Sequence, residues 1–179
     1  GPRERNQKTT TSSEGIAIQI LVDRSGSMRA LDFKKNDQPV DRLTAIKDVA
    51  GRFVLGDDEL DGRFSDLVGL VTFAGMATAQ TPPTLDHRFV VSQLNQTAIV
   101  TRRDEDGTAI GDAIGLAVEK LSTLDDAQDK QIKSKIAILL TDGENTAGDL
   151  EPLQAAELAK TLEIKVYTIG VGTKGRAPV

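Results

Sequence analysis

The sequence contains no cysteine, so disulfide bonds and thiolate metal ligands play no part in this protein, and the redox compartment stays open. Tryptophan is also absent, and the only histidine, His87, has no serine, cysteine or second histidine beside it. We expect this histidine to be a structural residue near the surface. The chain therefore offers neither a thiol nor an imidazole pair for a catalytic centre.

An excess of positive charge is lacking as well. The 22 lysine and arginine residues stand against 27 aspartate and glutamate residues, which gives a formal net charge of −5. Sequence-independent binding to phosphate backbones requires a basic surface. We therefore expect no nucleic-acid partner.

Long hydrophobic runs are missing too. No segment approaches the roughly 18 consecutive apolar residues that cross a bilayer, and the first residues lack the apolar core of a signal peptide. Residues 1–15 are polar and begin with Gly-Pro, which is typical of a protease cleavage remnant followed by a linker. We expect natural flanking segments to have been removed, which leaves a soluble fragment with one domain over residues 16–175 and a truncated tail over 176–179.

Apolar residues do occur in four short, nearly continuous runs. Runs of this kind, without alternation, are typical of parallel strands that helices cover on both faces. They lie at 16–22, 66–73, 135–140 and 165–171. Segment 77–84 contains two prolines, which cannot donate to a strand ladder, so it predicts an antiparallel strand at the sheet edge.

Helical patterns separate these strands. Apolar residues at spacings of three, four and seven predict one helix entered near Asp41, a second from Ile110 and a third with Pro152 in its first turn. The apolar stripes are Leu43, Ile46, Val49, Ala50, Phe53 and Val54; Ile110, Ile114, Ala117 and Leu121; and Leu153, Ala156, Ala159 and Leu162. Residues 85–94 predict a further short helix. This alternation predicts an α/β fold, a doubly wound, mostly parallel sheet with one antiparallel edge strand and helices on both faces.

Oxygen-bearing side chains follow two of the strands. Asp23 ends the first strand and Asp142 follows segment 135–140, while Thr108 lies in a loop before the second helix. In open α/β sheets, ligands bind beyond the carboxyl ends of the strands. If these two strands are neighbours, the three loops converge. Ser25 and Ser27 alternate with Asp23, so an extended exit from the strand would point three oxygens the same way.

These five residues supply two carboxylates and three hydroxyls. Ligation by oxygen alone selects a hard cation, and few protein ligands with room for water suit Mg²⁺ better than Ca²⁺, with Mn²⁺ or Ca²⁺ as alternatives. We expect Gly107, Gly143 and the helical residue Asp112 to surround the ligands without binding the ion.

Each residue alone also fits a simpler role. Asp23 is typical of an Asx turn or helix cap, and Thr108 of the N-cap of the helix that follows. The acidic run 104–106 is interpreted as a solvated loop. The metal interpretation depends on the three loops acting together.

The motifs resemble those of the von Willebrand factor type A domain. "DRSGSM" fits its D-x-S-x-S element, and Thr108 in "DGTAIGDAI" and Asp142 in "LLTDGEN" complete its metal-ion-dependent adhesion site. The resemblance implies that Ser25, Ser27 and Thr108 ligate the metal while Asp23 and Asp142 hold its waters. It also implies a Rossmann-like fold whose last strand and helix are not represented here, and a binding module rather than an enzyme.

Within that family, the segments "VGLVTFAGMATAQTPPTLD" and "TDGENTAGD" are most similar to the bacterial aerotolerance-operon (Bat) proteins. This similarity implies a bacterial inner-membrane protein with a periplasmic domain, associated with other Bat-type proteins and a MoxR-type AAA+ ATPase. The partner would offer a carboxylate, and no small-molecule substrate is expected. The alternative is a Mg²⁺-dependent phosphohydrolase that uses Asp23 as nucleophile, although Ser25 stands where an acid–base carboxylate would be expected.

Overall fold

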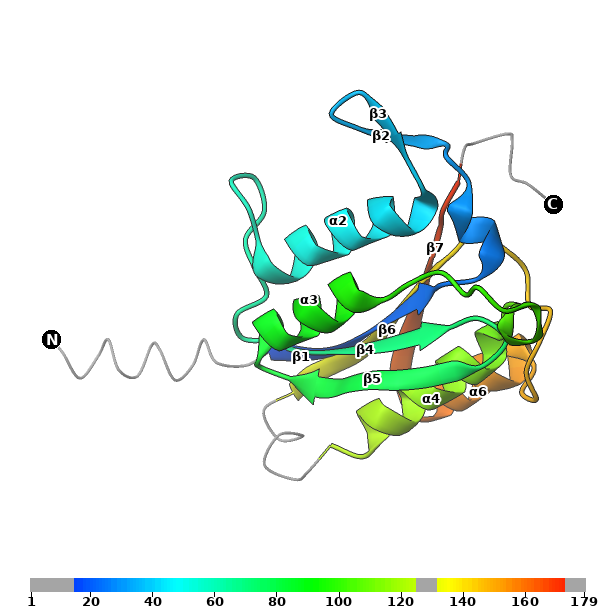
Figure 1. Cartoon of the computed structure of the whole chain (residues 1–179). Coiled ribbons are helices and arrows are strands. Elements are labelled where there is room, and N and C mark those ends of the chain that lie inside the picture. The colour runs from blue at the N-terminus through cyan, green and yellow to red at the C-terminus, as the bar shows by residue number, and fades with distance from the viewer. Residues whose placement is uncertain (1–14, 125–131, 173–179) are drawn as a thin grey trace, which may run out of the picture.

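A five-stranded sheet forms the centre of the computed structural model, which describes residues 15–124 and 132–172 (Figure 1). Its strands are β1 (Gly15–Asp23), β4 (Leu67–Phe73), β5 (Ala77–Thr84), β6 (Ile132–Thr141) and β7 (Ile164–Gly170), in the order β5-β4-β1-β6-β7. All neighbours pair in parallel except β4 and β5, which are antiparallel. The predicted strands and the antiparallel edge strand are confirmed. Most of the predicted linker and the whole predicted tail lie outside the described residues.

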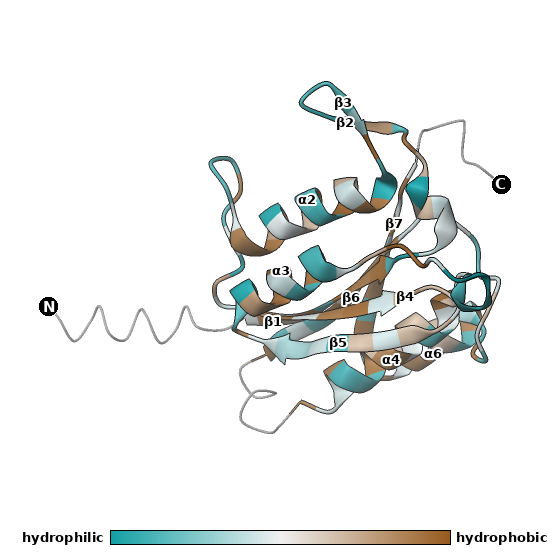
Figure 2. Ribbon diagram, in the orientation of Figure 1, coloured by the Kyte–Doolittle hydropathy of each residue, from teal (hydrophilic) through white to brown (hydrophobic). Residues whose placement is uncertain are grey.

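Helices cover both faces of this sheet. Helices α2 (Arg42–Leu55) and α3 (His87–Gln96) lie on one face, and α4 (Ile110–Ser122) and α6 (Pro152–Thr161) lie on the other (Figure 1). Because side chains alternate along β1, Ile18 and Ile20 pack toward α2 and α3, whereas Ala17 and Leu21 pack toward α4. Figure 2 shows α2 with hydrophobic and hydrophilic residues on opposite sides, as a helix that covers a sheet requires. The predicted doubly wound α/β fold is confirmed.

The prediction for α6 was wrong about the buried face. Of the predicted stripe, Ala159 is buried, whereas Leu153 and Leu162 are exposed by 71% and 43%. Ala155 is buried in their place. Small residues let the start of α6 lie close to α4, because a Cβ on Gly111 of α4 would lie 1.8 Å from the carbonyl oxygen of Leu150, just before α6. Sequence periodicity showed a helix, but it could not show that alanines form the contact.

Two further predictions required correction. Val49 of the α2 stripe is 58% exposed. His87, expected near the surface, is buried at the start of α3, where its Nε2 lies 2.6 Å from the carbonyl oxygen of Asp66. This contact agrees with a structural role for the histidine.

The segment between β1 and α2 contains structure that the sequence patterns did not predict. A 3₁₀ helix, η1 (Gly26–Arg29), is followed by an antiparallel hairpin of β2 (Phe33–Lys35) and β3 (Gln38–Val40). Its two turn residues, Asn36 and Asp37, have φ angles of 53° and 63°. A two-residue turn with positive φ at both positions matches the right-handed twist of the two strands that it connects. The hairpin projects beyond α2 (Figure 1).

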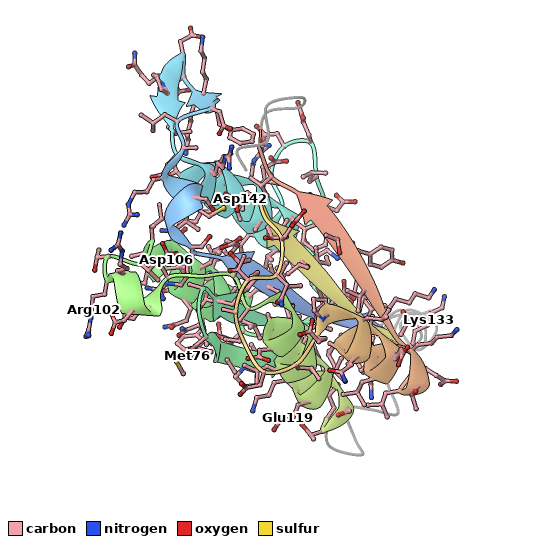
Figure 3. The ribbon with its side chains drawn as sticks, turned by 90° about the vertical axis from the view of Figure 1, so that its right-hand side faces the viewer. Met76, Arg102, Asp106, Glu119, Lys133 and Asp142 are labelled. Atoms are coloured by element: carbon pink, nitrogen blue, oxygen red, sulfur yellow. The ribbon has the colours of Figure 1, made fainter. Side chains whose placement is uncertain are left out.

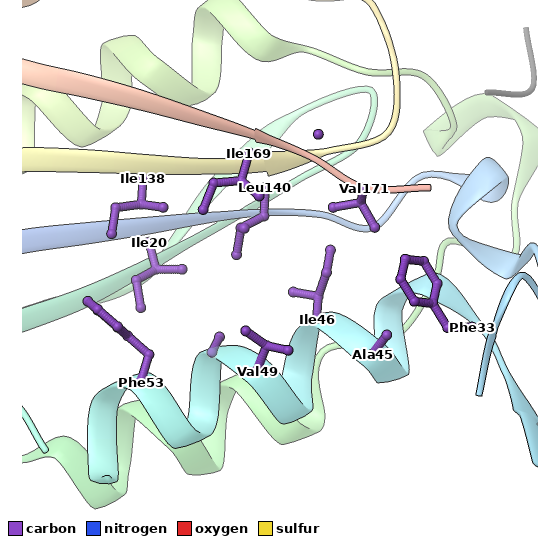
Figure 4. A pocket seen from close by; sticks show the side chains of 12 residues that line it. Ile20, Phe33, Ala45, Ile46, Val49, Phe53, Ile138, Leu140, Ile169 and Val171 are labelled. Atoms are coloured by element: carbon purple, nitrogen blue, oxygen red, sulfur yellow. The ribbon is translucent and has the colours of Figure 1, made fainter. Parts of the chain in front are cut away.

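An apolar cavity of about 270 Å³ lies between α2 and strands β1, β6 and β7 (Figure 4). Phe33, Val49, Phe53 and Ile169 are among its lining side chains. Strand β7 forms one edge of the sheet within the described residues. None of the described helices combines the length and the hydropathy needed to span a membrane.

Candidate metal centre

The carboxyl ends of β1 and β6 bring the predicted residues together. The two strands are parallel neighbours, with Val22 of β1 opposite Leu140 of β6, so Asp23 and Thr141 leave the sheet side by side. The prediction that these strands are neighbours is confirmed. Figure 3 looks onto this end of the molecule, where Asp142 and Asp106 lie on the loops beyond the strands.

Ser25 and Ser27 connect the first loop to Asp142. The two serine Oγ atoms are 3.1 Å apart, and the Ser27 hydroxyl donates to Oδ1 of Asp142 at 2.9 Å. Ser25 has an extended backbone, as predicted, whereas Ser27 lies inside η1. The expected extended exit therefore ends at Ser25, and the turn of η1 brings Ser27 toward Asp142.

Asp23 is completely buried, and both of its carboxylate oxygens accept hydrogen bonds. Oδ1 accepts from the backbone N–H of Ser25 at 2.8 Å, and Oδ2 accepts from the hydroxyl of Thr141 at 2.7 Å. The first of these bonds forms the turn that an aspartate at this position favours. Burial raises the pKa of Asp23, although the hydrogen bonds from Ser25 and Thr141 oppose this shift; repulsion from Asp142 raises it further.

Thr108 is held by the loop that follows β6, in a way that the sequence did not predict. Its backbone N–H donates to Oγ1 of Thr146 at 3.0 Å, and its carbonyl accepts from the N–H of Thr146 at 2.9 Å. The prediction that Thr108 caps α4 was wrong. The N-cap is Ala109, and Oδ1 of Asn145 accepts from the first helical N–H groups, those of Ile110 and Gly111. An amide from a distant loop thus satisfies the helix donors, so the hydroxyl of Thr108 is not needed for capping.

Glycines allow the loops to approach one another. Gly107 has a φ of 128°, a conformation that side chains other than glycine rarely adopt, and a Cβ there would lie 3.1 Å from the Cβ of Ala147. A Cβ on Gly143 would lie 4.0 Å from the hydroxyl oxygen of Thr108, which places Thr108 beside the loop of Asp142. Both glycines lie beside candidate ligands in the sequence, and their role at a metal stays a prediction.

Asp112 supports the same loop from α4. Its carboxylate accepts from the backbone N–H of Asp149 at 3.1 Å and of Leu150 at 2.7 Å. Gly148, with a φ of 94°, passes so close that a Cβ there would lie 2.6 Å from Oδ2 of Asp112. Asp112 therefore accepts hydrogen bonds from the loop that follows Asp142.

Asp106 forms specific hydrogen bonds between two loops, which the interpretation of segment 104–106 as a solvated loop did not include. Its Oδ1 accepts from the N–H of Gly26 at 2.9 Å and of Gly107 at 2.8 Å. These backbone hydrogen bonds lower the pKa of the carboxyl group. Asp106 thereby joins the first loop to the middle loop, although it remains exposed.

Arg42 was missed by the sequence analysis. Its side chain is 1% exposed, and its Nη1 donates to Oδ2 of Asp142 at 2.8 Å. Its Nη2 donates to Asp32 at 2.7 Å. An arginine at a helix start is usually exposed to solvent, so no local signal distinguished it. Asp41, beside it, caps α2 by accepting from the N–H of Thr44, as the predicted helix entry requires.

The donor set fits a hard divalent cation. It consists of hydroxyl and carboxylate oxygens, with neither imidazole nor thiolate, and oxygen-only sets are typical of Mg²⁺ and related ions. The described residues contain no group of three or more histidine, cysteine, aspartate or glutamate side chains placed to hold a metal. Any such ion must therefore use the serine and threonine hydroxyls along with the two aspartates.

A doubly wound sheet with converging, oxygen-rich loops at its carboxyl edge defines the class of domain to which this chain belongs. Residues 17–178 match the family model of the von Willebrand factor type A domain, and the chain is a member of that family. Solved structures agree. An aerotolerance-related membrane protein from Bacteroides fragilis is 30% identical with a TM-score of 0.71, over 92% of this chain and 72% of that one.

Two other proteins extend this comparison. The conserved hypothetical protein BatB from Bacteroides thetaiotaomicron is 30% identical with a TM-score of 0.63, over 92% of this chain and 74% of that one. A protein from Borreliella burgdorferi is 30% identical over 97% of this chain but only 46% of its own length. The chain thus spans less than half the length of such curated relatives.

Proposed function

We propose that this domain is a divalent-metal-dependent protein-binding module, in which the metal is Mg²⁺ and a carboxylate of the partner completes its ligand shell. Ser25, Ser27 and Thr108 would hold the ion, and Asp23 and Asp142 would balance its charge. A metal that keeps an open position supplies an electrophilic contact for an acidic side chain. The ordinary role of type A domains as interaction modules supports this proposal.

The different exposure of the candidate residues carries the proposal. Asp23 is fully buried and the Asp142 side chain is 1% exposed, whereas Ser27, hydrogen-bonded to Asp142, is exposed. The charged groups therefore lie beneath the surface, and Ser27, whose hydroxyl bonds to Asp142, is open to solvent. An ion bound above them would be reached from solvent by a partner.

The same geometry argues against the phosphohydrolase alternative. A nucleophilic aspartate must present a free oxygen to the phosphorus atom. Asp23 is buried, and its two oxygens accept hydrogen bonds from Ser25 and Thr141. The burial and hydrogen bonds of Asp23 suit a carboxylate that positions the surrounding loops better than they suit a nucleophile.

We further propose that the whole protein is a Bat-type, membrane-anchored protein of the bacterial inner membrane. In this proposal the domain faces the periplasm and works with other Bat-type proteins and a MoxR-type ATPase. Support comes from the two Bacteroides structures, one of a membrane protein related to aerotolerance and the other of BatB. The shared likeness to both favours this group among type A domains.

Metal binding and partner binding can be tested with one pair of serine variants. Ser27→Ala removes a candidate ligand, and Ser122→Ala removes an exposed serine at the end of α4, whose hydroxyl donates to the carbonyl oxygen of Glu119 in the same helix. Calorimetric titration with MgCl₂ should show binding by the wild type and by Ser122→Ala, and binding at least about tenfold weaker by Ser27→Ala. Circular dichroism should show three folded proteins.

Partner capture is then compared with and without metal. Beads carrying the wild-type domain, incubated with solubilised native membranes, should retain partner proteins in Mg²⁺ and release them in EDTA, and beads carrying Ser27→Ala should retain none. Recovery of a MoxR-type ATPase would support the finer assignment. Partner binding that persists in EDTA would refute the metal-dependent mechanism.

A further inference from the structure

Arg42 places a buried positive charge beside the candidate metal centre. Besides its bond to Asp142, its Nε and Nη2 donate to Oδ2 of Asp32 at 3.0 and 2.7 Å. The backbone of Gly172 also lies close to the guanidinium, since a Cβ there would be 3.3 Å from Nη2 of Arg42. The guanidinium is therefore held in one position by the backbone after β7, by Asp32 in the segment before β2 and by Asp142.

The two carboxylate oxygens of Asp142 consequently differ. Oδ1 accepts from the hydroxyl of Ser27, and Oδ2 accepts from Nη1 of Arg42. A guanidinium is planar and permanently charged. When it is held in place, it therefore forms a strong, charge-assisted hydrogen bond to its carboxylate partner. Oδ1 of Asp142 thus faces the candidate ligand Ser27, whereas Oδ2 faces Arg42.

Asp23 is restricted in a similar way. Its Oδ1 is bonded to the N–H of Ser25 and its Oδ2 to the hydroxyl of Thr141. Each carboxylate oxygen of the two aspartates thus already accepts a hydrogen bond, which disfavours binding of one cation through both oxygens of either side chain. This limit applies to the carboxylates whatever the remaining ligands are.

Cations differ in how much they depend on carboxylates that bind through both oxygens. Ca²⁺ takes about six to eight oxygen ligands and readily uses carboxylates that bind through both oxygens, whereas Mg²⁺ keeps near-octahedral geometry with several waters. We propose, building on the metal centre proposed above, that Arg42 determines metal specificity. By holding Oδ2 of Asp142, it denies Ca²⁺ a bidentate carboxylate and so favours Mg²⁺ and Mn²⁺.

A charge-neutral double variant isolates this effect. Asp32→Asn with Arg42→Met removes one negative and one positive charge, so the net charge near the centre is unchanged while Oδ2 of Asp142 is released. The matched control is Asp48→Asn with Arg52→Met. It removes an exposed ion pair of 3.3 Å on the same helix, with side chains 37% and 45% exposed.

Dissociation constants for MgCl₂ and CaCl₂ are measured by calorimetry for the three proteins. We expect the wild type and the control to bind Mg²⁺ more tightly, and the ratio of the Ca²⁺ to the Mg²⁺ constant to fall about tenfold or more in the Asp32/Arg42 variant. An unchanged ratio in a folded variant overturns the role of Arg42. A wild type that binds neither ion refutes the proposed metal centre itself, and with it this inference.

A crystal structure of the wild type grown in CaCl₂ tests the same point if the double variant fails to fold. Asp142 should face Ca²⁺ through Oδ1 alone, directly or through a bound water, with the bond from Arg42 to Oδ2 intact. Bidentate binding by Asp142, with that bond broken, would show that Arg42 does not control the carboxylate.

Discussion

Replacement of Asp112 by alanine should destabilise the fold and weaken metal binding together. The carboxylate accepts hydrogen bonds from the backbone N–H groups of Asp149 and Leu150. A hydrogen bond to a charged group contributes about 1.5–3 kcal/mol, and a carboxylate in the first turn of a helix adds about 0.3–1 kcal/mol. Because Asp112 is half-buried and some water can replace it, we expect a loss near 2 kcal/mol.

Urea denaturation followed by circular dichroism measures this loss. With a denaturant slope of about 2 kcal/mol/M, a change of about 2 kcal/mol moves the midpoint by about 1 M. Glu119→Ala, an exposed change on the same helix, should stay within about 0.5 kcal/mol of the wild type. A similarly small change for Asp112→Ala would refute the argument that this carboxylate holds the loop.

The metal provides a second measurement on the same variant. A ligand that binds only the folded state stabilises it in proportion to the logarithm of its concentration over the dissociation constant. If the loosened loop weakens Mg²⁺ binding tenfold, the stabilisation by saturating MgCl₂ falls by about 1.4 kcal/mol. Equal stabilisation of both proteins by MgCl₂ would show that the Asp112 contacts do not support the metal centre.

Two further predictions concern the core and the loop after α2. Leu21→Ala, at a side chain with 0% exposure, should cost about 2–5 kcal/mol in urea denaturation, whereas Leu153→Ala, at 71% exposure, should change little; equal losses would contradict the assigned core. Backbone N–H groups of Glu59 and Leu60 hold the pKa of Asp57 below its usual range. Because the folded pKa is the lower one, the stabilisation is present above the ordinary value and is lost as pH falls through the folded value. The protection factors of the Glu59 and Leu60 amides, which are corrected for the intrinsic exchange rate, should therefore fall at acid pH. Asp57→Asn should remove this pH dependence, and a pH dependence that persists in the variant would assign the effect to another group.

The layered fold could be predicted because its signals are local. Strands buried on both faces need continuous apolar residues, and the runs that became β1, β4, β6 and β7 have few other interpretations. The two prolines of segment 77–84 excluded a central position, and β5 lies at the edge. The hairpin of β2 and β3 was missed, because only three residues form each strand and no apolar pattern marks them.

The candidate site could be predicted in composition but not in arrangement. Asp23, Ser25 and Ser27 share one motif, Asp142 stands beyond a strand end, and Thr108 lies in the loop before the second helix. The contacts that position them come from residues without any such signal. Asn145 replaces the expected cap of Thr108, and Thr146 holds the Thr108 backbone.

The sequence by itself determined which segments are strands and helices, and which oxygen-bearing residues stand at the strand ends, because chain periodicity and position carry that information. Only the tertiary structure decided which face of α6 is buried and what surrounds Asp142. Both depend on distances between segments far apart in the chain. Arg42 lies 100 positions before Asp142 in the chain, yet it binds that carboxylate beneath the surface. Its burial follows from the packing of α2 against the sheet and from the backbone of Gly172, which no local pattern reports.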